Sequence, residues 1–250
     1  MSAFVRIVGS ATFLQERARR RLVTGTVLAS VGAIVFVVSL GIAEMAAELP
    51  PILGSFPSFL GLGALLVGGL RVLSARRDAA TIAGEGPVVA QLSARLNDDY
   101  VYLRHVALRS RGAEADGVLL GPHGALVLAI RALAGEFTVR GHDRFVLDDD
   151  GDERSFDRSP SWELVRTQRA VERVLKEHGL GEVPVQGAVV LVRGTLGDAD
   201  LPGTAIVPVE RIGSFVDYLR PEELPSPEPI RRAIEALEPH VDGQRRAPRR

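Results

Sequence analysis

Two long uncharged runs near the start of the chain constrain its architecture more than any other feature of the sequence. Residues 22–43 contain no charged side chain, and neither do residues 52–70. A helix needs about 20 apolar residues to cross the hydrocarbon core of a bilayer, and each run is close to that length. A cleaved signal peptide has a shorter apolar region, and a buried or re-entrant segment does not explain the arginines beyond the second run. We therefore predict a transmembrane helical hairpin over residues 22–73, which holds the protein in the membrane.

Charged residues around the two runs predict the orientation of this hairpin. Arginines precede the first run and follow the second, whereas the connection between the runs contains only acids. The residues concerned are Arg17, Arg19, Arg20, Arg21, Arg71, Arg76 and Arg77, and Glu44 and Glu48. Arginine-rich flanks stay on the cytoplasmic side of a membrane. We expect a multi-pass protein of the cell membrane with both termini and the soluble domain cytoplasmic, and with residues 1–21 as a basic cytoplasmic N-terminal segment.

Small residues in the second run predict how the two spans pack. The run contains Gly61, Gly63, Gly68 and Gly69. Glycines let helix backbones approach each other closely in a bilayer. We expect close packing of the two spans, and the pattern leaves a homo-oligomer or another protein partner open.

The composition excludes several kinds of site. The chain has no cysteine, which excludes disulfides and thiolate metal sites. Its formal net charge is −1, so no overall electrostatic field attracts nucleic acid. The sequence contains no glycine-rich phosphate loop and no histidine spacing typical of a metal site. Any binding or catalytic function must therefore come from a local arrangement of side chains.

The most informative stretch of the soluble part is residues 112–132. Residues 117–120 and 125–130 are apolar, and Gly121-Pro122-His123-Gly124 lies between them. Two apolar runs joined by these turn residues predict a β-hairpin. Because side chains alternate along a strand, the carboxylates at positions 114 and 116 share a face, as do the side chains at positions 129 and 131.

This stretch resembles the core of the NERD (nuclease-related) domain, a branch of the restriction-endonuclease-like superfamily. The family pattern is an acidic residue two positions before an aspartate, a hydrophobic strand, a Gly-Pro-x-Gly turn, and a second strand ending in Glu-x-Lys before a glycine. The chain matches this pattern at Glu114-Ala115-Asp116, at the turn and at Gly135. Ala129 and Arg131 occupy the positions of the Glu-x-Lys.

The resemblance implies an α/β fold with a restriction-endonuclease-like αβββαβ core and a mixed sheet, preceded by the two transmembrane helices. We assign residues 78–220 to the NERD-like domain and residues 221–250 to a proline-rich break, a short helix and a basic tail. The order of the elements predicted from periodicity agrees with the core. These elements are a helix from Pro87, strands at 100–108, 117–120 and 125–130, a hairpin at 137–147, a helix at 160–178, strands at 185–192 and 205–207, and helices at 210–219 and 230–237.

The resemblance also implies a chemistry. Enzymes of the superfamily hydrolyse phosphodiesters with Mg²⁺ held by the aspartate and glutamate of the pattern, while the lysine orients the attacking water. Asp116 and Glu114 can supply metal ligands. Ala129 can supply none, and Arg131 keeps a positive charge but cannot release a proton near neutral pH. Glu85 stands where the family often places an acid facing the site, although it can equally complement the N-terminus of a helix.

Two further positions belong to this prediction. Related domains often carry Pro-x-x-Gln at the start of the second core helix, whereas this chain has Pro160-Ser161-Trp162-Glu163. We expect Trp162 to be a core anchor rather than a platform for base stacking. We expect His105, on an apolar strand, to be a core or surface residue without a catalytic role.

Three hypotheses about function follow. The first is a membrane-anchored cytoplasmic domain of nuclease ancestry with a degenerate active site, which binds nucleic acid or a protein partner. The second is an active nuclease that uses Mg²⁺, Asp116 and a displaced carboxylate such as Glu114 or Glu85. The third is a purely structural interaction module at the membrane.

Overall fold

The computed structural model describes residues 5–9, 11–45, 51–108, 112–132, 135–140, 143–147, 153–155, 160–199, 205–219 and 227–241. Contacts divide the chain into two compact units, Thr12–Ile82 and a second unit formed by Met1–Ala11 with Ala83–Arg250. The connection between the two spans, residues 221–226 of the proline-rich break at 221–229, and the basic tail at 244–250 lie outside the described residues.

The unit Thr12–Ile82 is built from two long helices, α1 (Ala11–Met45) and the first part of α2 (Pro51–Arg95). The segments Gln15–Gly41 and Pro57–Arg76 are long and apolar enough to cross a membrane, judged by length and composition. Large apolar side chains on both helices are exposed, among them Ile34 at 63% and Phe59 at 67%. An exposed apolar surface of this kind is costly in water and fits a lipid environment.

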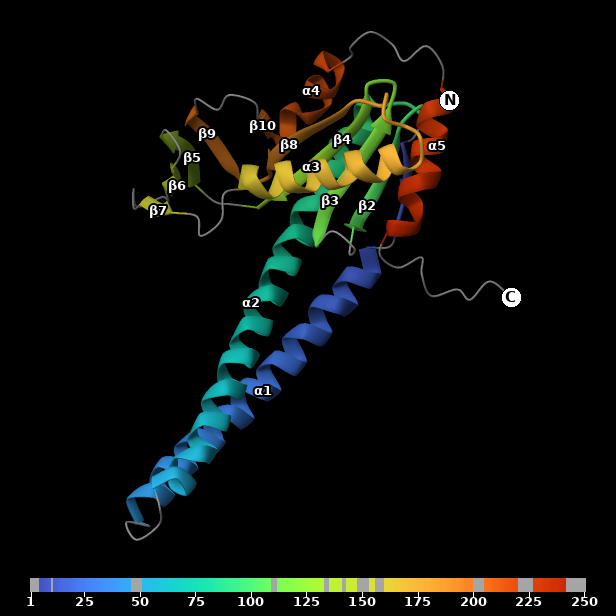
Figure 1. Cartoon of the computed structure of the whole chain (residues 1–250). Coiled ribbons are helices and arrows are strands. Elements are labelled where there is room, and N and C mark those ends of the chain that lie inside the picture. The colour runs from blue at the N-terminus through green and yellow to red at the C-terminus, as the bar shows by residue number, and fades with distance from the viewer. Residues whose placement is uncertain are drawn as a thin grey trace, which may run out of the picture. The chain divides into compact units, whose positions relative to one another are not determined.

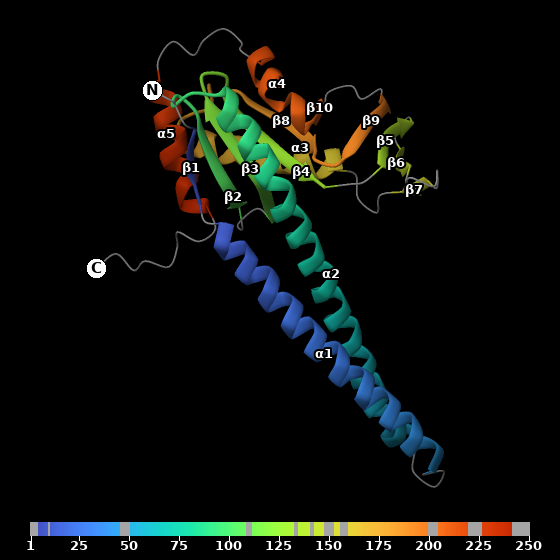
Figure 2. The ribbon, with the colours of Figure 1, turned by 180° about the vertical axis from the view of Figure 1, so that it is seen from behind.

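Glycines bring α1 and α2 into close contact (Figures 1 and 2). A Cβ at Gly32 would lie 2.6 Å from the backbone nitrogen of Leu65, and a Cβ at Gly61 would lie 2.6 Å from that of Phe36. A Cβ at Gly68 would similarly meet the backbone of Ala29. Close packing at Gly61 and Gly68 agrees with the prediction, whereas Gly63 and Gly69 face open space.

The other unit is organised on a mixed six-stranded sheet with the order β1-β2-β3-β4-β8-β10. Strands β2, β3 and β4 are antiparallel neighbours, while β1 pairs parallel with β2, and β8 pairs parallel with both β4 and β10. The strands are β1 (Arg6–Val8), β2 (Val101–Leu108), β3 (Ala113–Gly121), β4 (Gly124–Arg131), β8 (Val185–Leu191) and β10 (Ala205–Pro208).

Helices cover both faces of this sheet. Helices α3 (Pro160–Glu177) and α5 (Glu228–Leu237) pack on one face, as Figure 1 shows. The last turns of α2 and the short helix α4 (Ile212–Tyr218), which follows a 3₁₀ turn at Val209–Arg211, pack on the other face (Figure 2). A sheet buried on both faces explains why its central strands are almost continuously apolar.

A second sheet of four short strands, in the order β7-β6-β5-β9, accompanies the first. The antiparallel pair β5 (Gly135–Arg140) and β6 (Asp143–Leu147) corresponds to the predicted hairpin. Strands β7 (Glu153–Ser155) and β9 (Gly194–Ala199) extend it on either side, and the sequence did not lead us to expect them. Beyond α5, a 3₁₀ turn at Glu238–His240 leads to Val241, the last described residue, which pairs with Val106 of β2.

The predicted fold class is confirmed: a mixed α/β unit with the αβββαβ order follows two apolar helices. Two features of this arrangement go beyond the prediction. Strand β1 precedes α1 in sequence and yet pairs with β2, which follows α2. Helix α1 begins at Ala11, well before the uncharged run.

In the middle of the sheet, the side chains of β2 and β3 shift from one face of the sheet to the other at the same point. Leu103 and Val106 both belong to the core under α3, although strict alternation would place them on opposite faces. Ala115 and Val118 repeat this change on β3, and the pairing register is unchanged across it. His105 lies at this point with a φ of 45°, a left-handed conformation that is strained for a residue with a side chain.

Candidate active site

Asp116 lies where β3 and β4 stop pairing. The backbone pairing between these strands ends at Gly117 and Leu128. Beyond this pair, the carboxylate of Asp116, and not a backbone carbonyl of β3, accepts the hydrogen bond from β4. The backbone N–H of Ile130 donates to Oδ2 of Asp116 at 2.8 Å. The side chain therefore satisfies a strand N–H that would otherwise lack a partner at this edge of the ladder.

Arg131 bridges two carboxylates from different elements. Its Nη1 donates to Oδ2 of Asp116 at 2.9 Å, and its Nη2 donates to Oε2 of Glu163 at 3.0 Å. Nη1 also donates to the carbonyl oxygen of Ile130 at 2.8 Å. The guanidinium is about three-quarters buried, with a side-chain exposure of 23%. Its fixed positive charge is thus shared between Asp116 and Glu163, and it joins β4 to the first turn of α3.

Glu163 is the residue of this site that the sequence analysis missed. It occupies the position at which related domains often carry glutamine, and the departure from the pattern was the available signal. The structure explains the significance of the change. Position 129 of β4, where the family pattern has a glutamate, is an alanine in this chain. The site instead contains a carboxylate on α3, that of Glu163, and Arg131 forms an ion pair with it.

Glu85 lies on the last part of α2 and forms a buried ion pair with Arg104 of β2. The distance from Arg104 Nε to Glu85 Oε1 is 3.1 Å, and the carboxylate is 3% exposed. Burial raises the pKa of Glu85, and the positive charge of Arg104 opposes that rise. Burial also raises the pKa of the neighbouring Tyr102 phenol well above its usual value. Gly117 makes room for this ring, because a Cβ there would lie 2.2 Å from the Tyr102 hydroxyl.

His105 and Glu114 form a separate contact on the adjacent strands β2 and β3. The distance from His105 Nδ1 to Glu114 Oε1 is 3.9 Å, and the imidazole is almost fully buried. Burial by itself would lower the pKa of His105. The carboxylates of Glu114, Asp116 and Glu85 more than offset that effect, so the pKa is raised. The predicted position on an apolar strand is correct, but the strained backbone and the acidic surroundings were not foreseen.

The residues present do not fit a Mg²⁺ site of the superfamily type. Oδ2 of Asp116 already accepts hydrogen bonds from Ile130 and Arg131, and Ala129 has no ligand atom. Glu114 is directed to His105, and Glu85 to Arg104. Among the residues that the structure describes, no set of three His, Asp or Glu side chains is arranged to hold a metal ion. The roles predicted for Asp116, Glu114, Arg131 and Glu85 remain predictions.

The outer face of α3 differs from the prediction at Trp162. The indole is 59% exposed, so the expectation of a core anchor was wrong. The helix turns Leu164, Val171 and Val174 to the sheet instead, and Trp162 points outward because it lies on the opposite side of the 3.6-residue repeat. The guanidinium of Arg166 stacks over the indole, with its central carbon 5.3 Å from the ring centroid.

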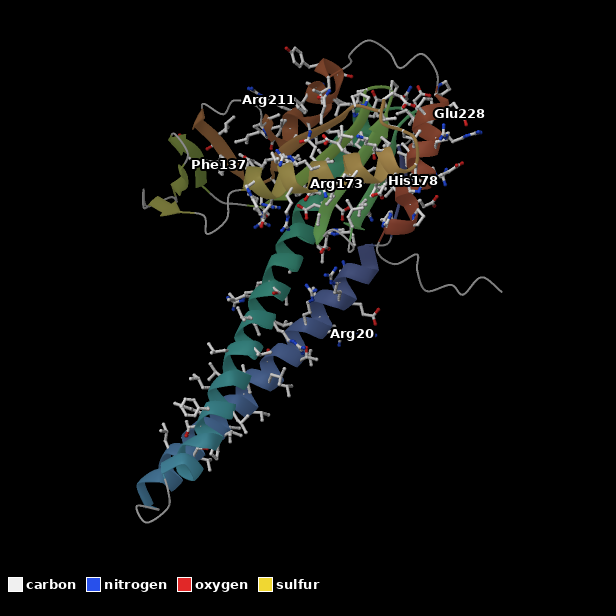
Figure 3. The ribbon with its side chains drawn as sticks, in the orientation of Figure 1. Arg20, Phe137, Arg173, His178, Arg211 and Glu228 are labelled. Atoms are coloured by element: carbon white, nitrogen blue, oxygen red, sulfur yellow. The ribbon has the colours of Figure 1, made fainter. Side chains whose placement is uncertain are left out.

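A basic stripe continues from this tryptophan along α3. After Trp162, the residues at alternating spacings of four and three positions are all positively charged and exposed. None of these four cations forms an ion pair with a described residue. In a 3.6-residue helix these side chains lie within about 80° of one another. The basic stripe consists of Trp162, Arg166, Arg169, Arg173 and Lys176; Arg173 is marked in Figure 3.

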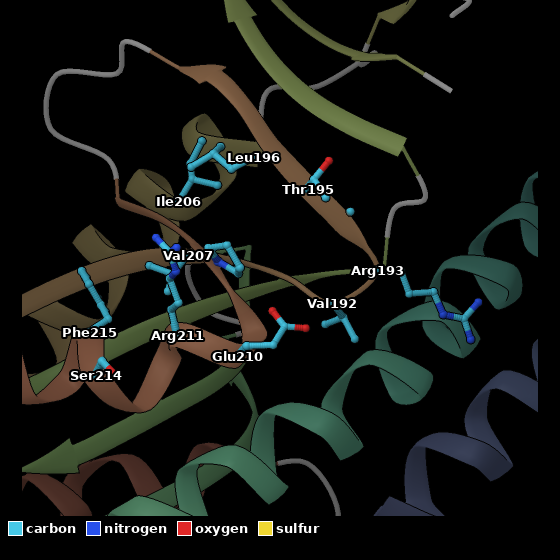
Figure 4. Close-up of a pocket in the computed structure, with 12 residues that line it drawn as sticks. Val192, Arg193, Thr195, Leu196, Ile206, Val207, Glu210, Arg211, Ser214 and Phe215 are labelled. Atoms are coloured by element: carbon cyan, nitrogen blue, oxygen red, sulfur yellow. The ribbon is translucent and has the colours of Figure 1, made fainter. Parts of the chain in front are cut away.

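An open pocket of about 810 Å³ lies beside the end of β8 (Figure 4). Val192 connects it to the candidate site, because its side chain lines the pocket and its backbone N–H donates to the carbonyl oxygen of Arg131 at 3.0 Å. The lining is mainly apolar. The carboxylate of Glu210 lies among the lining side chains, whereas Arg193 extends away from them. Arg211 is the second arginine of the lining, so the pocket combines positive and negative side chains on a mainly apolar wall.

The six-stranded mixed sheet, with helices on both faces and Asp116 at the split between β3 and β4, defines a mixed α/β domain. Residues 80–192 match the family model of NERD, the nuclease-related domain, and the chain therefore contains a NERD domain over this segment. No curated protein and no solved structure matches the chain.

Proposed function

We propose that this protein is a membrane-anchored domain of nuclease ancestry that binds nucleic acid without hydrolysing it. The observation that carries the proposal is the bridge formed by Arg131. A guanidinium held between Asp116 and Glu163 supplies, inside the protein, the positive charge that a metal ion would otherwise supply to these carboxylates. The carboxylates thus have a counter-charge without a metal, and Arg131, at the position of the family's lysine, cannot release a proton to act as a base.

The basic stripe on α3 supports binding to a phosphate backbone. Four cations without an ion-pair partner among the described residues lie on one exposed helix face, and several phosphates can be contacted at once along it. Trp162, at the N-terminal end of the stripe, offers an exposed aromatic surface for an unpaired base. We therefore expect single-stranded nucleic acid to bind more tightly than duplex.

The chain topology supports a membrane hairpin. Strand β1 precedes the two apolar helices and pairs with β2, which follows them. A sheet cannot form across a membrane, so both outer ends of the hairpin must lie on the same side. Arginines flank the two spans at these ends, which favours the cytoplasmic side.

The chain's single tryptophan provides a direct test of binding. The full chain in detergent is titrated with 20-nucleotide single strands and duplexes while the fluorescence of Trp162 is recorded. Anisotropy of a labelled oligonucleotide gives a second readout that does not depend on the indole. We expect quenching on binding, and an affinity that decreases as salt is raised.

Two triple variants that each lose three positive charges are compared. Replacing Arg166, Arg169 and Arg173 by glutamine should weaken binding at least tenfold and reduce the slope of log K against log salt by about 2 for a single strand. The control replaces Arg6, Arg193 and Arg231, which are exposed elsewhere in the domain. Equal losses for both triple variants, or absence of binding at 50 mM salt, would contradict the proposal and leave the structural interaction module.

A second candidate function is metal-dependent hydrolysis with a displaced carboxylate. One observation favours it: Asp116 and Glu163 reach the same guanidinium from two elements, so a shift of Arg131 would leave two carboxylates facing each other. The test incubates the full chain with DNA and RNA in the presence of Mg²⁺, Mn²⁺ or chelator. Cleavage that requires metal and is abolished by Asp116→Asn would establish this function in place of the first.

A further inference from the structure

A pocket lined by arginines from both helices lies in the helical unit, away from the site described above. It has a volume of about 430 Å³ and is lined by Arg20, Arg21 and Thr24 of α1 and by Arg71 and Ser74 of α2. Ligand pockets in proteins commonly fall between about 300 and 1,000 Å³, so a small polar group fits it. Figure 3 marks Arg20 on α1.

The arginines of this pocket lie at one level of the hairpin. Arg21 directly precedes the first uncharged run, and Arg71 directly follows the second. Gly25, one helical turn beyond Arg21, faces α2 so closely that a Cβ there would lie 3.0 Å from the Cβ of Arg71. The pocket therefore lies where both uncharged runs end, which in a bilayer is the level of the lipid phosphates.

The guanidinium groups are the hydrogen-bond donors that this pocket offers to a ligand. The hydroxyl of Thr24 already donates to the carbonyl oxygen of Arg20 at 2.8 Å, and that of Ser74 donates to Leu70 at 2.9 Å. Arg20 pairs with Glu16 on the same exposed helix face, an arrangement that is weak in water. Arg71 has no ion pair or hydrogen bond with another described residue. Guanidinium groups on two helices can thus form bidentate hydrogen bonds to one phosphate group.

We propose that the pocket formed by Arg20, Arg21, Thr24, Arg71 and Ser74 binds the phosphate of an anionic phospholipid headgroup. The ligand chemistry is a phosphate ester with a net negative charge, held at the boundary of the hydrocarbon core. The inference rests on the membrane anchoring proposed above but is independent of nucleic-acid binding. A bound headgroup would tie α1 to α2 at the membrane surface.

The test compares two lipids with the same phosphodiester and different net charge. The purified full chain in detergent is titrated with phosphatidylglycerol or phosphatidylcholine, and bound lipid is counted by native mass spectrometry. Arg20→Gln with Arg71→Gln removes two charges from the pocket. Arg19→Gln with Arg76→Gln removes the same charge from exposed positions of the same helices that do not line the pocket.

We expect phosphatidylglycerol to bind in preference to phosphatidylcholine. Each arginine removed from the pocket should weaken binding about fivefold, whereas the control pair should change it less than twofold. Equal binding of the two lipids, or equal losses in the two variant pairs, would overturn the proposal. Displacement of phosphatidylglycerol by 10 mM inorganic phosphate would also overturn it, because the pocket would then take the free anion.

Membrane extraction separates failure of this inference from failure of the anchor. A chain that resists extraction at high pH but shows no preference between the lipids refutes the headgroup site alone. A chain released from membranes by the same treatment refutes the anchor, and with it the headgroup site. Circular dichroism of both variant pairs verifies that the helices are retained.

Discussion

Nη2 of Arg131 and Oε2 of Glu163 lie 3.0 Å apart, and this contact joins the end of β4 to the first turn of α3. The same guanidinium contacts Asp116 through its other terminal nitrogen. A lysine ammonium would be a single point charge at this position, whereas the planar guanidinium holds both carboxylates at once. The arginine thus stabilises the fold at a position where the family pattern has a residue of the reaction.

Removing Arg131 should destabilise the domain because it leaves two partly buried carboxylates without a counter-charge. We expect Arg131→Ala to reduce the free energy of unfolding by about 1–2 kcal/mol, at the lower end for a buried charge because solvent reaches the site. Urea unfolding of the full chain in detergent, followed by circular dichroism, measures the change. Adding Asp116→Asn and Glu163→Gln should recover most of the loss. A loss below about 0.3 kcal/mol for Arg131→Ala would argue against the bridge.

Metal binding should appear when the family pattern is restored. The variant Ala129→Glu, Arg131→Lys, Glu163→Gln places a second acid on β4 and removes both the guanidinium and the carboxylate that compete for the site. We expect it to bind Mn²⁺ with a dissociation constant of about 10⁻³ M or tighter. The unmutated chain should not bind, because Arg131 occupies both Asp116 and Glu163. The double variant Arg131→Lys, Glu163→Gln should not bind either, because Asp116 alone holds the ion too weakly. Calorimetric titration with Mn²⁺ measures this, and tight binding by the unmutated chain would contradict our account.

His123 should make the domain less stable in acid. Its imidazole is 1% exposed and stacks on Tyr100, with the ring centroids 5.7 Å apart. Burial lowers the pKa of His123 from its usual value of 6.5 to about 4. The unfolded chain therefore binds a proton that the folded chain excludes as the pH falls below about 6.5, and stability decreases by roughly 3 kcal/mol down to pH 4.

The variant His123→Leu isolates this contribution. It removes the titrating ring, so its stability should fall less steeply between pH 6.5 and 4 than that of the unmutated chain. Other groups titrate in the same window, and the difference between the two unfolding curves cancels them. Parallel pH profiles for the two proteins would show that His123 is not buried as a neutral ring.

The topology can be tested without background labelling because the chain has no cysteine. Ala47→Cys places a thiol in the connection between the spans, and Asp98→Cys places one at an exposed position after α2. In intact spheroplasts, a membrane-impermeant maleimide should label the first variant and not the second, because a hairpin exposes only its turn outside. After permeabilisation both should react. Labelling of Asp98→Cys in intact spheroplasts would rule out a cytoplasmic domain.

Local features of the sequence were sufficient to predict much of the fold. The two uncharged runs predicted two apolar helices, and the Gly121-Pro122-His123-Gly124 turn between apolar runs predicted the pairing of β3 with β4. The same stretch carried the family pattern that the comparison confirms. These predictions succeeded because helix length, strand alternation and turn chemistry depend on neighbouring residues.

Other parts of the structure depend on residues that are distant in sequence. Strand β1 is short, and only its partner β2 on the far side of the hairpin makes it a strand. The strain at His105 arises because β2 and β3 change face together, which neither strand specifies by itself. Trp162 was misassigned because its environment depends on which face of α3 meets the sheet.

The sequence by itself determined that the glutamate and lysine of the family pattern are replaced by Ala129 and Arg131. Only the tertiary structure decided that Arg131 contacts Glu163 as well as Asp116, and that Glu85 is held by Arg104. The physical reason is that an ion pair requires two charges within about 4 Å, whereas a sequence gives the charges without the distances. The first turn of α3 packs against the end of β4 and so brings Glu163 within hydrogen-bond distance of Arg131.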